Sequence, residues 1–129
     1  MFLDHCPQAK KNSSFLLHTY PVVDANWTEG FNLREFVDDL GIGSNVRFAD
    51  PMGYLIGLEE EEMAVLYNSA DILVSTSYGE GFCLPLIEAG SCEVPAIGTT
   101  FSAYPEIIGE DRGWLVDIVD HVPFQRISS

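Results

Sequence analysis

Short apolar runs alternate along the chain with stretches in which apolar residues recur at helical spacing. This alternation is typical of a parallel β-sheet with helices on both faces, and it predicts an α/β fold. The expected strands are residues 15–19, 45–48, 72–76, 95–98 and 114–116. With no internal repeat, low-complexity stretch or linker, residues 1–129 are expected to form a single domain.

Helix signals lie between these strands. Asn32 followed by Glu35 reads as a capping box, and the helix that it opens is expected to end with Gly41 as its C-terminal cap. A second helix is expected over residues 59–69, where four glutamates at the N-terminus are favoured by the helix dipole. A brief helix is expected over residues 105–108. The inward face of the second helix is expected to hold Met63, Leu66 and Tyr67.

A glycine-rich segment follows the third expected strand. Residues 79–90 read Gly-Glu-Gly-Phe-Cys-Leu-Pro-Leu-Ile-Glu-Ala-Gly. Glycines in a strand-to-helix turn let backbone N–H groups approach an anion closely, and the helix N-terminus favours negative charge. Pro85 suits a first helical turn, so the helix is expected to begin near Phe82 or Cys83. The segment therefore predicts a phosphate-binding loop.

Two glutamates, Glu80 and Glu88, flank this loop. With the helix beginning at Cys83, their carboxylates would lie about 8 Å apart along the axis, which suits a pyrophosphate between two hydroxyl-rich groups. An ionised carboxylate only accepts hydrogen bonds, so Glu80 would bind a sugar at one end and Glu88 a ribose at the other. The alternative is a solvated loop acid and an ordinary glutamate on a helix surface.

The loop and its neighbours resemble the nucleotide-sugar-binding domain of retaining glycosyltransferases of the glycogen-synthase-like group, family four. That family has the two-domain GT-B architecture, so the resemblance implies a Rossmann-like half of a GT-B fold. It spans roughly residues 13–117. One motif position, usually glycine, is Cys83 here. The matching residues are Ser75 to Ser77, Glu80, Gly81, Phe82, Cys83, Leu84, Pro85, Glu88, Ala89, Val94 to Ile97, Pro105 and Glu106.

The resemblance implies roles for these residues. Glu80 would be the catalytic residue that contacts the transferred sugar, the amides of residues 81–84 would hold the diphosphate or sugar, and Glu88 would bind the ribose. Residues 51–54 would lie near the base, which is the loosest of these assignments. The donor would be a UDP-, GDP- or ADP-sugar, and no metal is expected. The expected donor-binding residues are Gly79, Gly81, Phe82, Cys83, Leu84, Glu88, Thr99 and Ser102.

Thr99 and Ser102 enter this set because ligands of open parallel sheets bind beyond the carboxyl ends of the strands. Thr100 belongs to the same stretch. Their hydroxyls would add contacts to the donor. The alternative reading, equally open, is that they are ordinary polar residues of a loop.

The resemblance also predicts parts that this chain lacks. The family's donor domain begins with a strand and loop that carry an Arg and a Lys for the donor phosphates, and an acceptor domain precedes it. In the family, the absent strand lies between the two strands that match residues 15–19 and 72–76. Without it, each of these two strands would lack a neighbour on one side. We therefore expect a fragment of a longer enzyme, nearly inactive alone, or a chain that shifts its strands together or pairs with another copy.

Composition narrows the class of partner. A net charge of −14, from 20 acidic and 6 basic residues, argues against nucleic acid and anionic lipid. The sequence has neither a membrane-length apolar run nor a basic-then-apolar leader, which predicts a cytoplasmic protein. Three cysteines, Cys6, Cys83 and Cys92, have no metal-ligand spacing and are expected to be reduced.

Three other readings have to be weighed. A non-catalytic nucleotide-binding module and a sugar-nucleotide epimerase of the same architecture both fit the phosphate loop. A phosphoacceptor receiver domain fits the length and acidity, but it requires an acidic pair after the first strand and a lysine after the fifth. Here Asp38 and Asp39 fall inside an expected helix, and no lysine follows Lys11. The acceptor of the transferred sugar stays unidentified in the transferase reading.

Overall fold

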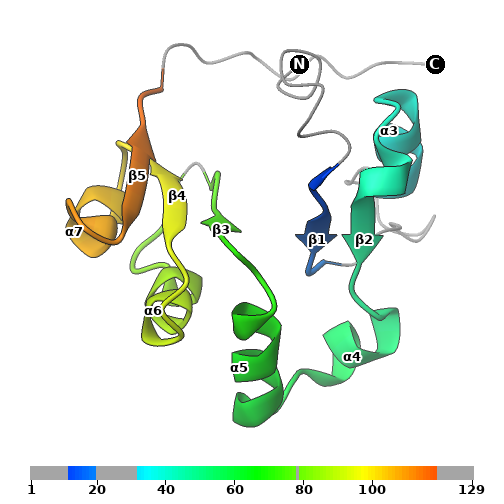
Figure 1. The fold of residues 1–129 in the computed structure, drawn as a ribbon, viewed down its shortest axis with the longest axis horizontal. Helices are drawn as coiled ribbons and strands as arrows, with labels where there is room; N and C mark the ends of the chain where they lie inside the picture. The colour runs from blue at the N-terminus through cyan, green and yellow to red at the C-terminus, as the bar shows by residue number, and fades with distance from the viewer. Residues whose placement is uncertain (1–11, 20–31, 78, 119–129) are drawn as a thin grey trace. The chain divides into compact units, whose positions relative to one another are not determined.

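The computed structural model describes residues 12–19, 32–77 and 79–118, and the chain divides into two compact units, Met1–Leu58 and Glu59–Ser129 (Figure 1). In the first unit the elements are β1 (Phe15–Leu17), α3 (Leu33–Asp39), the 3-10 helix η1 (Gly43–Asn45), β2 (Val46–Phe48) and α4 (Pro51–Ile56). In the second they are α5 (Glu60–Asn68), β3 (Leu73–Val74), α6 (Leu84–Ser91), β4 (Ala96–Thr99), α7 (Tyr104–Ile108) and β5 (Gly113–Val116).

All described strands pair in parallel, as the alternating pattern predicts. β1 pairs with β2, and β3, β4 and β5 form a second sheet in that order. Ala96 of β4 lies between Leu73 of β3 and Gly113 of β5. Among the described residues, β1 pairs only with β2 and β3 only with β4. The expectation that these two strands lack a neighbour because a strand is missing stays a prediction.

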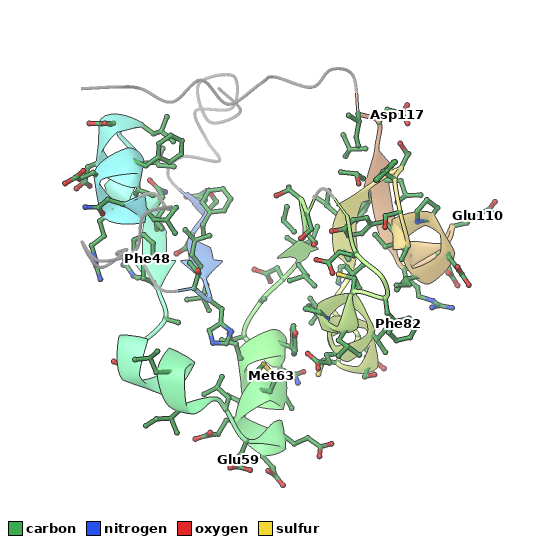
Figure 2. The ribbon with its side chains drawn as sticks, turned by 180° about the vertical axis from the view of Figure 1, so that it is seen from behind. Phe48, Glu59, Met63, Phe82, Glu110 and Asp117 are labelled. Carbon is green, nitrogen blue, oxygen red and sulfur yellow. The ribbon has the colours of Figure 1, made fainter. Side chains whose placement is uncertain are left out.

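Helix α3 begins at the predicted Asn32 cap and ends just before Gly41, but of the predicted capping box the structure gives only the bonds that Asn32 accepts. The Asn32 side chain caps it, accepting hydrogen bonds from the backbone N–H groups of Arg34 at 3.1 Å and Glu35 at 3.4 Å. Gly41, just beyond the helix, has a φ of +63°, the left-handed conformation that glycine adopts at little cost. The Arg34 guanidinium lies 5.0 Å from the centre of the Phe48 ring on β2, whose position Figure 2 marks.

A buried asparagine joins two distant segments of the first unit. Asn45 is 8% exposed, and its Nδ2 donates to the Ser13 carbonyl oxygen at 2.8 Å. Ser13 precedes β1 and Asn45 precedes β2, so this bond supports the start of the parallel ladder. The sequence analysis placed Asn45 in the strand itself, whereas the structure places it in η1.

Helix α4 is absent from the sequence analysis, which assigned residues 51–54 only to the neighbourhood of the base. Asp50 caps this helix, and its Oδ2 accepts from the Gly53 N–H at 2.8 Å. Pro51 occupies the first turn and Gly57, with a φ of +89°, ends the helix. The helix is short and contains a glycine, which has low helix propensity, so its pattern is weak.

Helix α5 lies within the predicted range. Glu59 is its N-cap and forms a capping box with Glu62, whose Oε2 accepts from the Glu59 N–H at 3.0 Å. The predicted inward residues are half-buried, whereas Val65 on another face is 70% exposed. No helix in the described parts of the chain is long and apolar enough to cross a membrane.

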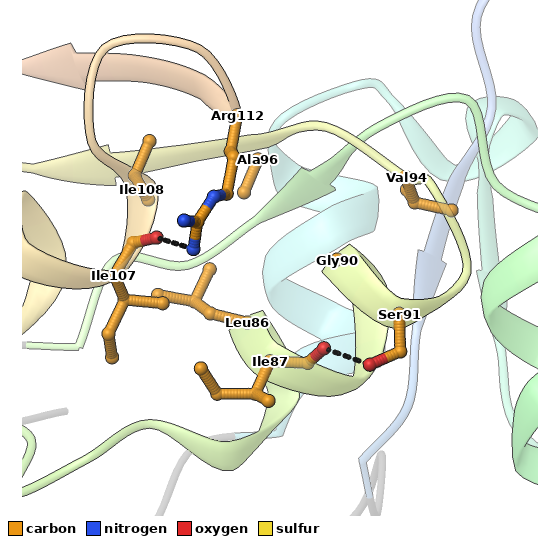
Figure 3. A pocket seen from close by; sticks show the side chains of 9 residues that line it. All are labelled: Leu86, Ile87, Gly90, Ser91, Val94, Ala96, Ile107, Ile108 and Arg112. Carbon is orange, nitrogen blue, oxygen red and sulfur yellow. Dashed lines mark hydrogen bonds between the residues drawn. The ribbon is translucent and has the colours of Figure 1, made fainter.

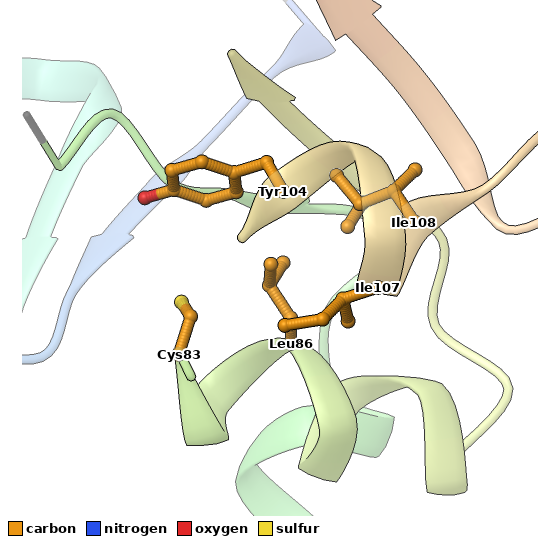
Figure 4. Packing of buried hydrophobic residues seen from close by; sticks show 6 residues of the cluster. Cys83, Leu86, Tyr104, Ile107 and Ile108 are labelled. Carbon is orange, nitrogen blue, oxygen red and sulfur yellow. The ribbon is translucent and has the colours of Figure 1, made fainter. Parts of the chain in front are cut away.

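The core of the second unit lies where α6 and α7 pack on β4 (Figure 4). Tyr104 is fully buried and Ile108 is 1% exposed. A Cβ added at Gly98 of β4 would lie 2.7 Å from Tyr104 Cδ1 and 2.8 Å from Ile108 Cδ1. The absence of a side chain at residue 98 therefore lets α7 approach the sheet closely. The remaining cluster residues are Cys83, Leu86, Ala96 and Ile107.

Candidate functional site

The glycine-rich loop leads from β3 into α6, as predicted. Helix α6 begins at Leu84, and Cys83 is its N-cap with a φ of 53° and a ψ of 66°. These angles are left-handed, a conformation that costs a non-glycine residue roughly 1–2 kcal/mol. The thiol side chain is only 5% exposed and belongs to the buried cluster. The left-handed backbone gives a physical reason for the glycine that is usual at this motif position. Cys83 lacks the conformational freedom of glycine, and its side chain instead packs in the core.

The start of α6 has free backbone donors. No side chain in the described part of the chain caps the helix, and Pro85 has no N–H group. Within the described residues, the N–H groups of residues 81–84 have no hydrogen-bond acceptor. Chain neighbours aside, no atom of the described residues lies within 4 Å of the position that a Cβ would take at Gly79 or Gly81. The loop is therefore open beside its free amides, an arrangement that suits an anion.

Ser102 fixes the backbone of Glu80. Its Oγ accepts from the Glu80 N–H at 3.1 Å and donates to the Glu80 carbonyl oxygen at 2.6 Å, across 22 residues of sequence. Ser102 itself has a left-handed φ of +60°. The sequence analysis assigned this hydroxyl to the donor. In the structure it joins the loop after β4 to the loop after β3, and its contact with a donor stays a prediction.

Glu88 has a partner that the sequence analysis missed. The Tyr67 hydroxyl on α5 donates to Oε2 of Glu88 on α6 at 2.7 Å. Burial, followed by this hydrogen bond and the Glu88 charge, raises the pKa of Tyr67 well above its ordinary value of 10.0. Tyr67 was expected only as an inward residue of its helix. No local signal names the partner, because the pair depends on how α5 packs against α6.

A half-buried hydroxyl contact lies between the end of β3 and α7. Ser75, just after β3, has its Oγ 2.8 Å from the Tyr104 hydroxyl, and the Cys83 Sγ is 4.0 Å from the same Oγ. Tyr104 is fully buried, so its hydroxyl needs a protein partner. The strand-end serine of the motif therefore satisfies the tyrosine that anchors α7.

The remaining candidates differ in exposure. Phe82 and Leu84 are 59% and 60% exposed, and Figure 2 marks Phe82 beside α6. Thr99 ends β4, and its Oγ1 is buried without a hydrogen-bond partner among the described residues. Thr100 is exposed. The candidate set thus combines two exposed apolar side chains with one unsatisfied hydroxyl.

Two of the three cysteines lie in the described part of the chain. Cys83 and Cys92 are free thiols. Cys6 lies outside the described residues. Within the described ranges, no three His, Cys, Asp or Glu side chains gather in a way that could hold a metal ion.

A pocket of about 260 Å³ lies elsewhere in the second unit, between α6, β4 and α7 (Figure 3). At its edge Arg112 Nη1 donates to the Ile107 carbonyl oxygen at 3.1 Å. None of the predicted donor-binding residues lines this pocket. Its lining is Leu86, Ile87, Gly90, Ser91, Val94, Ala96, Ile107, Ile108 and Arg112.

Comparison with known proteins gives several relatives that transfer sugars. The chain is 39% identical over 64 residues to the O-antigen chain mannosyltransferase B of Escherichia coli, covering 50% of this chain and 16% of that protein. It is 33% identical over 88 residues to the D-inositol 3-phosphate glycosyltransferase of Paenarthrobacter aurescens, covering 67% of this chain and 20% of that protein. The Streptomyces avermitilis enzyme of the same name is 29% identical over 132 residues, covering 98% of this chain and 26% of that protein.

The chain therefore spans 16% to 26% of the length of these three relatives. A family model described as glycosyl transferases group 1 matches residues 4–124, almost all of the sequence. The match confirms the resemblance, and the parallel α/β units agree with a Rossmann-like half of a GT-B fold. The chain belongs to the glycosyl transferases group 1 family.

Proposed function

We propose that the chain supplies the donor-binding part of a retaining glycosyltransferase that uses a nucleoside diphosphate sugar. The observation that carries the proposal is the uncapped N-terminus of α6, where free amides of residues 81–84 lie in sequence between Glu80 and Glu88. Family membership supports the transfer of a sugar. The three relatives named above, one mannosyltransferase and two D-inositol 3-phosphate glycosyltransferases, are in keeping with it.

In this proposal each part of the loop has one role. The amides and the positive end of α6 bind the diphosphate and stabilise the charge that develops as it leaves. Glu80, with its backbone fixed by Ser102, accepts hydrogen bonds from hydroxyls of the transferred sugar. Glu88 accepts hydrogen bonds from the ribose hydroxyls. Because the chain carries 20 acidic and only 6 basic residues, neutral amides are its main local partners for phosphate.

Calorimetric titration with UDP-, GDP- and ADP-sugars tests the proposal. We expect one series to bind and Glu88→Gln to weaken it about tenfold, because a charge-assisted hydrogen bond becomes a neutral one. Glu110→Gln is the matched control, since Glu110 is also exposed and belongs to the same unit (Figure 2). Absence of binding in all three series, or equal effects of the two substitutions, would contradict the proposal.

Retention is tested by the product. The anomeric configuration of the product made by the full enzyme can be read by NMR and compared with that of the donor. A product with the donor's configuration is expected, and an inverted one would exclude a retaining transferase.

A further inference from the structure

The Tyr67–Glu88 hydrogen bond joins two helices at one of the proposed donor-binding residues. The hydroxyl-to-carboxylate distance of 2.7 Å is short, as in charge-assisted hydrogen bonds. Tyr67 is half-buried at the end of α5, whereas Glu88 is exposed on α6. The exposed carboxylate is thus held by a half-buried side chain of the neighbouring helix.

The bond leaves Glu88 able to bind a second partner. A carboxylate offers about four acceptor positions, and Tyr67 occupies one of them on Oε2. An unrestrained glutamate would have to lose side-chain rotamer freedom on binding a ligand. In this structure the hydrogen bond has already removed much of that freedom. Glu88 is therefore pre-organised to accept further hydrogen bonds.

Tyr67 also remains a donor under physiological conditions. Its burial and the neighbouring Glu88 charge raise its pKa, so the phenol keeps its proton at neutral pH. The carboxylate of Glu88 can only accept. The direction of the bond, from Tyr67 to Glu88, is consequently fixed.

We propose that Tyr67 is a positioning residue that orients the Glu88 carboxylate toward the ribose hydroxyls of the donor nucleotide. This inference rests on the proposed function, because it needs Glu88 to bind the ribose. Tyr67 acts through Glu88 and does not itself touch the sugar. Its contribution is therefore expressed only when the ligand has ribose hydroxyls.

Titrations of UDP, GDP and ADP, each compared with its 2′,3′-dideoxy counterpart, test the inference. For the nucleotide that binds, recognition of the ribose hydroxyls is measured by one ratio. It is the dissociation constant of the dideoxy nucleotide divided by that of the ribonucleotide. We expect Tyr67→Phe, which keeps the ring, to lower that ratio roughly three- to tenfold, the usual scale of one hydrogen bond. Affinity for the dideoxy nucleotide should stay within about twofold of the unmodified chain.

Ser69→Ala is the matched control. The Ser69 hydroxyl, just beyond α5, also donates at 2.7 Å, but to the Leu66 carbonyl oxygen. Its removal should leave the ratio unchanged. Circular dichroism of each variant establishes that it is folded.

Glu88→Ala separates the two ideas. We expect it to bring the ratio close to one and to make a second change, Tyr67→Phe, silent. If Glu88→Ala leaves the ratio unchanged, the ribose role of Glu88 is wrong and the inference about Tyr67 is wrong with it. If Glu88→Ala brings the ratio close to one but Tyr67→Phe leaves the ratio unchanged, only the inference about Tyr67 is wrong. Equal losses for both nucleotides, or tighter ribonucleotide binding, in Tyr67→Phe would also overturn it.

Discussion

Ser102→Ala tests whether one hydroxyl holds the Glu80 loop in place. The substitution removes two hydrogen bonds, the 3.1 Å bond from the Glu80 N–H and the 2.6 Å bond to its carbonyl oxygen. Serine and alanine have the same backbone cost at a φ of +60°, so that term cancels. At about 0.5–1.5 kcal/mol net for each of the two hydrogen bonds, the closed loop should lose roughly 1–3 kcal/mol.

Amide hydrogen exchange at Glu80 measures this loss directly, because the Glu80 N–H is the donor in one of the two bonds. A loss of roughly 1–3 kcal/mol corresponds to exchange about 5- to 150-fold faster. The Ser75 N–H, which donates to the Ile97 carbonyl oxygen at 2.9 Å within the sheet, is the internal reference. Its exchange should change far less.

Ser102→Gly provides the comparison. Glycine removes the same hydroxyl but tolerates a left-handed φ, so it should recover roughly 1 kcal/mol of global stability relative to alanine. Glu80 exchange should still be fast in this variant. If Glu80 exchanges at the unmodified rate after Ser102→Ala, the hydroxyl does not hold the loop and the reasoning is refuted.

Three further results are expected. Gly98→Ala should lower the free energy of unfolding by about 1–3 kcal/mol in a denaturant titration, because the new methyl group would overlap Tyr104 and Ile108; an unchanged midpoint would exclude the tight contact. Asn32→Ala should cost about 1 kcal/mol in the same titration and Asn32→Asp much less, since aspartate also caps helices; equal losses would argue against the cap. Because the folded chain binds the Tyr67 proton more tightly than the unfolded chain does, its stabilisation is complete below pH 10 and decreases above it. An ultraviolet titration of Tyr67→Phe should therefore lose one phenol whose pKa is raised above 10.

Elements with strong local signals were predictable from the sequence. The acid-rich start of α5 and the Asn32 cap of α3 gave helix boundaries within a residue or two. Helix α6 was expected to begin near Phe82 or Cys83 and begins at Leu84. In each case the signal lies within one turn of the boundary, so no knowledge of the remaining fold is needed.

Contacts between distant residues were not predictable in the same way. Tyr67 donating to Glu88 depends on two helices that are 21 residues apart at the contact, and Ser102 holding Glu80 depends on two loops meeting. A single sequence shows which side chains can donate or accept hydrogen bonds. It does not show which of them meet in the fold. The sequence therefore identified the glutamates of the candidate site, and the structure supplied the residues that hold them.

The buried thiol at the start of α6 has a consequence for chemical labelling. A maleimide or iodoacetamide can reach a sulfur atom that is 5% exposed only when the first turn of α6 lifts away from the tyrosine beneath it. Alkylation of Cys83 should consequently be slow and limited by that opening. Cys92, which is half-buried at the other end of the helix, should react faster and serves as the reference thiol. A nucleotide bound to the amides of the loop would hinder this opening. The alkylation rate of Cys83 should then fall as the loop is occupied, and it would report nucleotide binding without an added label.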